Sequence, residues 1–162
     1  NMVWHHRFSV EEVRAATGLS DDEIAAALTR FDIRPDNRPP RAKDAPVLAR
    51  RPGRFDSRVV EPGPSPLMTP EGILLVYNGA DDQLVYRTGW VLFDREDPTR
   101  VLARSDTPIF APQRGWEIQG QVPNVVFVEG LVREGKRWLF YYGGADKHVG
   151  VAEAMTVDPA SP

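Results

Sequence analysis

The chain has 162 residues, and its apolar fraction of 41%, charged fraction of 27% and net charge of -3 are typical of ordinary globular proteins. A slightly negative chain has no basic field for binding phosphodiester backbones, so we expect no nucleic-acid partner. The absence of cysteine excludes disulfides, thiolate nucleophiles and cysteine-ligated zinc.

The sequence also predicts a location in the cytoplasm. No apolar run approaches the roughly 20 residues of a membrane span, so we expect no membrane partner. The first residues, NMVWHHRF, lack the charged-then-apolar layout of a secretory signal.

Residues 1–34 contain two helix signals in succession. Ser9-x-x-Glu12 and Ser20-x-x-Glu23 both have the form of a capping box, and Gly18 lies between them. After each box apolar residues recur at helical spacing: Val10, Val13 and Ala16, then Ile24, Ala27, Leu28 and Phe31. The pattern predicts a small helical hairpin over residues 1–34.

Two short helices joined by a glycine turn also suggest a helix-turn-helix. The second helix reads DDEIAAALTR, and its acidic start would face the phosphates in the usual docking mode. We therefore favour packing or protein contact over DNA binding for this hairpin. Residues 35–50 are rich in proline and arginine and contain few apolar side chains, which predicts a linker.

Residues 51–156 differ in character, and a short tail follows at 157–162. Short β-rich runs lie at 73–77, 84–93, 122–128, 138–142 and 149–152. Turn signals separate them at 71–72, 78–79, 95–98, 133–136 and 143–144. This pattern predicts a mostly β fold, but the pattern alone leaves a sandwich, a barrel and a propeller open.

Four consecutive strings in this region resemble one family of carbohydrate-active proteins. They are GPSPLMTPEGILLVYNGAD, YRTGWVLFDREDPTRVLARSDTPIFAP, WEIQGQVPNVVFVEGLV and WLFYYGGADKHVGVAEA. Their order and content are similar to the C-terminal part of glycoside hydrolase family 130. The resemblance covers about residues 51–154.

The resemblance implies a partial five-bladed β-propeller, comprising its last two to three blades, with a sugar site at the central funnel. It also implies β-mannoside oligosaccharides as substrates. Members of this family transfer mannose to inorganic phosphate or hydrolyse the mannoside with water, and both routes invert the anomeric centre.

Inverting cleavage requires a general acid, which in this family is an aspartate of an early blade. No residue within 1–50 matches that position, and Asp32, Asp36 and Asp44 are more typical of solvated side chains. The resemblance therefore implies an incomplete catalytic domain in this chain.

Residues in and around the first string bear on whether phosphate or water is the nucleophile. Tyr77 keeps the tyrosine of the family's Tyr-His pair, whereas Asn78 replaces the histidine, and we expect both to contact substrate. Val59 lies where the family's phosphorylases have a basic residue that binds phosphate, and Arg58 is one residue away. Glu61 lies where the phosphorylases have glycine, and a carboxylate there repels phosphate but can activate water.

We therefore predict hydrolysis, with Glu61 as the candidate base. A β-mannooligosaccharide phosphorylase is the alternative, with inorganic phosphate as co-substrate, and we expect no other cofactor. A non-catalytic sugar-binding or interaction module is a further alternative.

Asp146, in the string GGAD, matches the family aspartate that contacts mannose hydroxyls, although it could also be a turn residue. Asn124 is a candidate to line the funnel or to cap a turn. Glu117 is either a supporting acid or an exposed loop carboxylate. Three tryptophans could stack on sugars, but packing between blades is the more common role of such residues: Trp90, Trp116 and Trp138.

Two or three blades without the others would expose strand edges and apolar faces. We therefore predict self-association through exposed propeller edges, as in a truncated or rearranged gene product. A helical-hairpin adaptor attached to a decayed propeller is the competing interpretation. The three histidines, His5, His6 and His148, are too few and too poorly spaced for a metal site.

Overall fold

A computed structural model describes residues 7–34, 36–37 and 45–156. The chain divides into two compact units, residues 1–42 and 43–162. The predicted tail at 157–162 lies outside the described residues, as do His5, His6 and Asp44. No helix in the described ranges is long and apolar enough to cross a membrane.

The N-terminal unit contains the predicted helical hairpin. Helix α1 spans Val10–Thr17 and helix α2 spans Asp21–Arg30. Both capping boxes are formed, because the Ser9 and Ser20 hydroxyls accept from the third helical amide while the glutamates accept in return. Gly18 ends α1 at φ 72°, a left-handed conformation that glycine adopts without strain.

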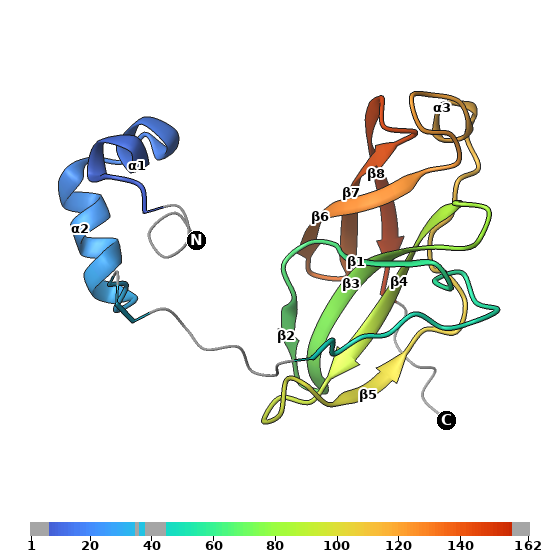
Figure 1. Cartoon of the computed structure of the whole chain (residues 1–162), viewed down its shortest axis with the longest axis horizontal. Coiled ribbons are helices and arrows are strands. Elements are labelled where there is room, and N and C mark those ends of the chain that lie inside the picture. The colour runs from blue at the N-terminus through green and yellow to red at the C-terminus, as the bar shows by residue number, and fades with distance from the viewer. Residues whose placement is uncertain (1–6, 35, 38–44, 157–162) are drawn as a thin grey trace. The chain divides into compact units, whose positions relative to one another are not determined.

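The second unit is mostly β, as predicted, and consists of two antiparallel sheets (Figure 1). The first sheet has the order β1-β3-β4-β5, with β2 also paired to β3. Its strands are β1 Val59–Pro62, β2 Leu67–Thr69, β3 Gly72–Ala80, β4 Tyr86–Phe93 and β5 Val101–Arg104.

The second sheet has the order β6-β7-β8. Its strands are β6 Val126–Glu134, β7 Arg137–Gly144 and β8 His148–Met155. A long loop crosses from β5 to β6 and includes the short helix α3, Gly115–Ile118 (Figure 1). The 133–136 hairpin turn is found close to its predicted place, between β6 and β7.

Two predicted turns are wrong. Asn78 and Gly79 lie inside β3, because the Asn78 carboxamide bonds the other sheet and the backbone at Gly79 packs closely on Asp56. A Cβ on Gly79 would lie 2.6 Å from the Asp56 Cβ, so the glycine serves close packing and not a turn. The turn predicted at 143–144 instead lies at residues 145–147.

Two predicted strand starts are also wrong. The strand predicted from residue 84 begins at Tyr86, because Leu84 has a φ of 58°. The strand predicted from residue 122 begins at Val126, since Asn124 has a φ of 60°. A positive φ is incompatible with a regular strand, and asparagine tolerates it better than most residues.

The core consists of two groups of buried side chains. Phe55, Tyr77, Val91 and Phe93 form one on the first sheet. Val76, Val126, Val128 and Tyr142 form the other, between the two sheets. Leu48 packs against the first group and the Ala49 carbonyl accepts from Arg104, so the last residues of the predicted linker are attached to the β-rich unit.

Candidate functional site

One face of the first sheet presents a row of polar residues toward the second sheet. Glu61 pairs with Asn78 across β1 and β3, and Asn78 pairs with Thr88 across β3 and β4. Ala80 pairs with Tyr86 in the same register. Because side chains alternate between the faces of a strand, Glu61, Asn78 and Tyr86 share one face.

The second sheet contributes residues to the same place. The Tyr86 amide donates to the Asn124 carbonyl at 2.9 Å, and Tyr86 and Val125 form an isolated parallel bridge. The Ala145 amide donates to the Val125 carbonyl at 3.1 Å. Asp146, the next residue, therefore lies on a turn tied directly to the segment that touches Tyr86.

Charged side chains surround the Tyr86 phenol closely enough to act on its pKa. Burial raises the pKa of the Tyr86 phenol above its ordinary value, and the negative charges of Glu61 and Asp146 raise it further. The positive charge of Arg58 acts in the opposite direction. Tyr86 is therefore a neutral hydroxyl at physiological pH, flanked by two carboxylates and one guanidinium. We call Arg58, Glu61, Tyr86, Asn124 and Asp146 the rim cluster.

In the described part of the chain, three side chains of the rim cluster have unpaired polar groups. Among the described residues, the side chains of Glu61, Tyr86 and Asp146 have no hydrogen-bond or ion-pair partner. Glu61 and Tyr86 are partly exposed and Asp146 is exposed. These oxygens are available to donate to or accept from hydroxyl groups of a ligand.

Asn78 is adjacent to the cluster but its side chain is fully used. Its carboxamide oxygen accepts from the Val128 amide at 2.9 Å and from the Thr88 hydroxyl at 3.1 Å. Its nitrogen donates to the Val128 carbonyl at 3.0 Å. Asn78 is completely buried and joins the two sheets beneath Glu61, a bonding pattern that supports structure more than substrate contact.

Tyr77 lies on the opposite face of the sheet. Its hydroxyl donates to Asp56 Oδ2 at 2.7 Å and accepts from Arg104 Nε at 3.1 Å. Asp56 is fully buried and also bonds Arg51 Nη2 at 2.9 Å. The predicted site residues are therefore divided: Glu61, Asp146 and the Asn124 backbone lie close to Tyr86, whereas Tyr77 belongs to a largely buried ionic network.

Glu117 is buried, so the exposed alternative for this residue is wrong. Its carboxylate accepts from the Gln113 amide at 2.7 Å, the Arg114 amide at 2.9 Å and the Tyr142 hydroxyl at 2.6 Å. Burial acts to raise the pKa of Glu117, but these hydrogen bonds outweigh it and lower that pKa below its ordinary value. Tyr141, by contrast, is exposed on the other face of β7.

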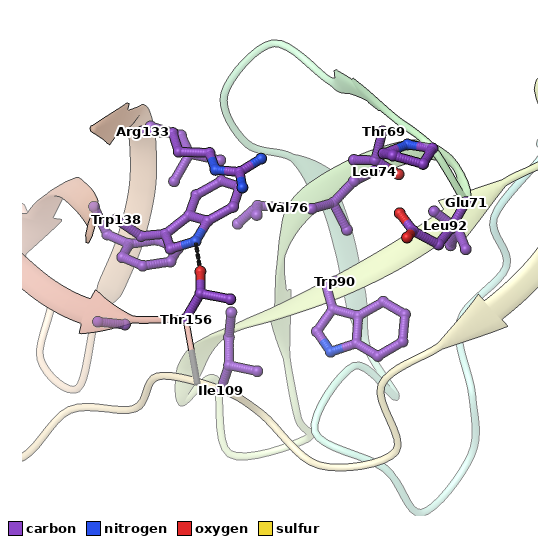
Figure 2. A pocket seen from close by; sticks show the side chains of 14 residues that line it. Thr69, Glu71, Leu74, Val76, Trp90, Leu92, Ile109, Arg133, Trp138 and Thr156 are labelled. Atoms are coloured by element: carbon purple, nitrogen blue, oxygen red, sulfur yellow. Dashed lines mark hydrogen bonds between the residues drawn. The ribbon is translucent and has the colours of Figure 1, made fainter. Parts of the chain in front are cut away.

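A hollow of about 640 Å³ lies between the two sheets at the β2–β3 turn and the β6–β7 hairpin (Figure 2). Trp90 comes from the first sheet and Trp138 from the second. The Trp138 indole donates to the Thr156 hydroxyl at 2.7 Å, and Arg133 lies over its ring at 5.1 Å. Most of the other lining side chains are aliphatic, so this cleft offers few partners for sugar hydroxyls.

Trp116 packs inside the fold. Its ring stacks on Tyr142 with centroids 5.6 Å apart, and it forms a T-shaped pair with His148, with centroids 6.0 Å apart. The described residues contain no group of three or more histidine, aspartate or glutamate side chains placed to bind a metal ion.

The two antiparallel sheets define a mostly β protein, and comparison with known proteins identifies the family. Residues 36–158 match glycoside hydrolase family 130, described as beta-1,4-mannooligosaccharide phosphorylase. The chain therefore belongs to this family, as its sequence motifs indicated.

Characterised relatives carry names of the same kind. The chain is 46% identical over 107 residues to a 1,2-beta-oligomannan phosphorylase of Thermoanaerobacter sp. strain X514, a match covering 66% of this chain and 36% of the relative. It is 43% identical over 100 residues to a beta-1,2-mannobiose phosphorylase of Listeria innocua, covering 62% of this chain and 28% of that one.

Solved structures with related names are also similar to this chain. The beta-1,2-mannobiose complex of the Listeria innocua phosphorylase superposes with a TM-score of 0.65 at 40% identity, covering 67% of this chain and 31% of that one. A second structure belongs to work on family members that are hydrolases targeting beta-1,2 mannosidic linkages in Candida mannan; its TM-score is 0.64 at 41% identity, covering 71% and 35%. The chain spans about a third of the length of these relatives.

Sequence reasoning missed Tyr86, which lies at the centre of the cluster. The residue opens the string YRTGWVLF, so its motif was visible, but only the cross-strand register shows which face it occupies. Arg58 was noted only as a near match to a basic position. Its amide donates to the Ala80 carbonyl, and Ala80 pairs with Tyr86, so its charge acts on Tyr86 through an arrangement that spacing does not reveal.

Proposed function

We propose that the rim cluster is part of a site for β-linked mannosides, and that the chain contributes to their cleavage by an inverting mechanism. The observation that carries this proposal is the convergence of unpaired oxygens from Glu61, Tyr86 and Asp146 in a family of mannoside-active proteins. A sugar presents several hydroxyls, which such oxygens bind through hydrogen bonds.

The roles within the cluster follow from its chemistry. The exposed carboxylate of Asp146 accepts hydrogen bonds from two neighbouring mannose hydroxyls. The Tyr86 phenol, which is neutral at physiological pH like an ordinary tyrosine, donates to a sugar oxygen. Glu61 acts as the general base that removes a proton from an attacking water. The general acid is supplied by a group outside the described residues.

Water is the nucleophile that the charge balance favours. The cluster combines two carboxylates with one guanidinium, so its net charge is negative and it repels a phosphate dianion. We infer hydrolysis on this basis. The β-1,2 linkage is the preferred substrate, because the relatives named for that linkage are 43–46% identical and a β-1,4 relative is 32% identical.

Phosphorolysis is the second candidate, and Arg58 is the specific observation that favours it. Its guanidinium lies in the cluster, and arginine binds phosphate through paired hydrogen bonds. The relatives named above are also phosphorylases. Inorganic phosphate would then be the co-substrate.

The wider arrangement is also part of the proposal. The two sheets correspond to two blades of a five-bladed propeller, and the rim cluster faces its central funnel. The opposite, exposed face of the second sheet contains Tyr141, Val149 and Val151, with Val149 84% exposed. An apolar sheet face of this kind supports self-association, which buries it.

The test of function is product analysis with β-1,2- and β-1,4-mannobiose, with and without inorganic phosphate, together with calorimetric binding. We expect β-1,2-mannobiose to bind, and any product to be free mannose whether phosphate is present or not. Mannose 1-phosphate formed only with phosphate would instead establish the phosphorylase.

Variants connect the result to the cluster. Glu61→Gln should abolish turnover and leave binding within about threefold of the wild type, since a general base acts on the chemical step. Glu71→Gln is the matched control, because Glu71 is an exposed glutamate in the β2–β3 turn, where it lines the cleft of Trp90 and Trp138 and not the cluster. Absence of mannobiose binding by the wild-type chain would refute the site.

A further inference from the structure

The loop between β5 and β6 holds together the parts of the rim cluster that come from the second sheet. The Asn124 amide donates to the Ile118 carbonyl at 3.2 Å, and the Val125 amide donates to the Glu117 carbonyl at 3.0 Å. These bonds fold residues 117–125 into a closed loop. The Asn124 carbonyl at its end accepts from Tyr86.

The same loop is bonded to the turn that carries Asp146. The Val122 amide donates to the Ala145 carbonyl at 3.2 Å, and the Ala145 amide donates to the Val125 carbonyl at 3.1 Å. The two segments are also in tight contact, because a Cβ on Gly120 would lie 2.4 Å from the Ala145 carbonyl oxygen. A shift of this loop therefore moves Asp146 as well.

One side-chain pair fixes the other end of the loop. The Glu117 carboxylate caps α3 by accepting from the Gln113 and Arg114 amides, and it also accepts from the Tyr142 hydroxyl at 2.6 Å. Tyr142 belongs to β7 and is buried between Trp116 and Phe110. Its hydroxyl thus connects the loop to a rigid strand.

Neither residue contacts the cluster directly. Glu117 is 2% exposed and Tyr142 is 5% exposed, and their polar side-chain atoms bond only one another and backbone amides of the loop. Their effect on a ligand must act through the backbone bonds to Asn124 and Ala145.

We propose that Glu117 and Tyr142 are positioning residues that fix Asn124 and Asp146 in the geometry that binds a mannoside. This inference rests on the proposed function of the rim cluster. It goes beyond that proposal in assigning part of the ligand affinity to a buried pair that no ligand touches.

Two variants and one control test the pair. Glu117→Gln replaces the charged acceptor, and Tyr142→Phe removes only the hydroxyl, so one variant remains informative if the other fails to fold. The control is Asp94→Asn, because Asp94 also accepts from two backbone amides, those of Glu96 and Asp97, and from an arginine. Asp94 follows Phe93 at one end of β4, whereas Tyr86 lies at the other end.

The first measurement is amide hydrogen exchange, which needs no ligand. The amides of Val122, Val125 and Ala145 should exchange about tenfold faster in Glu117→Gln than in the wild type. Exchange at these amides should be unchanged in Asp94→Asn. Unchanged exchange in both test variants would overturn the proposal.

The second measurement is calorimetric titration with β-1,2-mannobiose at a temperature at which every variant is folded. Glu117→Gln and Tyr142→Phe should weaken binding about tenfold, whereas Asp94→Asn should bind as the wild type does. Faster exchange with unchanged affinity would overturn the positioning role. If the wild-type chain binds no mannobiose, the proposed function fails, and hydrogen exchange alone still decides whether the pair fixes the loop.

Discussion

The two faces of the first sheet use carboxylates in opposite ways. On one face Asp56 is fully buried, and its oxygens bond the side chains of Tyr77, Arg51 and Arg104. On the other face Glu61 lies partly exposed at the rim, with no such bond among the described residues. The first arrangement leaves nothing for a ligand to bind, and the second leaves an acceptor available.

We propose that this contrast distinguishes structural polar groups from ligand-binding ones better than residue type does. Tyrosines and acids occur on both faces, and the sequence predicted a site residue on each of them, Tyr77 on one and Glu61 on the other. A buried polar group must be satisfied internally, because leaving it unpaired costs stability. A group that binds a ligand must instead keep a free hydrogen-bond donor or acceptor at an accessible position. The predictions below test this division, from the largest expected effect to the smallest.

Asp56→Ala should produce the largest loss of stability. Removing the carboxylate leaves Arg51 and Arg104 without their shared counter-charge, and Arg104 is only 10% exposed. We expect the free energy of unfolding to fall by about 3–5 kcal/mol in urea denaturation. Asp106→Ala, which removes an exposed acid paired with Arg51, should have a much smaller effect. Equal effects of the two variants would contradict the division.

Asn78→Ala should be nearly as damaging, because it breaks the bridge between the sheets. The substitution leaves the Val128 amide and carbonyl without partners. We expect a loss of about 2–4 kcal/mol in the free energy of unfolding, measured in the same way. A variant as stable as the wild type but impaired in mannobiose binding would return Asn78 to the substrate-binding set.

Asp146→Asn should affect binding and leave stability unchanged. Asp146 is exposed, has no side-chain partner among the described residues and has a φ of 52°, which asparagine tolerates. Loss of the charged acceptor should weaken β-1,2-mannobiose binding about tenfold by calorimetry, with an unchanged thermal midpoint. A lowered midpoint with unchanged affinity would mean that Asp146 is only a turn residue.

Glu117→Gln should reduce the dependence of stability on acid pH. Because the pKa of Glu117 is lowered in the folded state, this residue stabilises the fold above its ordinary pKa of about 4.3. That contribution is lost as the pH falls through the lowered folded value. Between pH 6 and pH 3 the unfolding free energy of the variant should therefore fall less than that of the wild type. Parallel curves would contradict the assignment.

Val151→Lys should weaken self-association with the smallest effect on the fold. Val151 is 56% exposed and pairs with Tyr141 across β7 and β8. A lysine on this apolar face adds charge that an interface would have to desolvate. The apparent mass in sedimentation should fall relative to the wild type. A monomeric wild-type chain would refute the prediction of self-association.

Much of the fold could be predicted from the sequence because the relevant signals are local. Both capping boxes lie within four consecutive residues, and they formed as predicted. The errors occurred where distant contacts decide the outcome. Asn78-Gly79 has the composition of a turn, but Asn78 bonds Val128 some fifty residues away and thereby stays in a strand.

The site was predicted less completely for the same reason. Family motifs pointed to Asn124 and Asp146, and a departure from them pointed to Glu61; Glu61, Asp146 and the Asn124 backbone all lie close to Tyr86. The motifs also included Tyr77, because a motif reports that a residue recurs without showing which face of the sheet it occupies. Tyr86 was missed because its position depends on the pairing with Ala80 and on the bond to Asn124.

The central claim is that sugars bind at the rim cluster and not in the cleft of Trp90 and Trp138. It is tested most directly by recording amide NMR spectra of the ¹⁵N-labelled chain during titration with β-1,2-mannobiose. The account predicts that shifts concentrate on Tyr86, Val125 and Asp146. Shifts confined to Trp138 and the residues that surround it in the cleft, or no shifts at all, would contradict it.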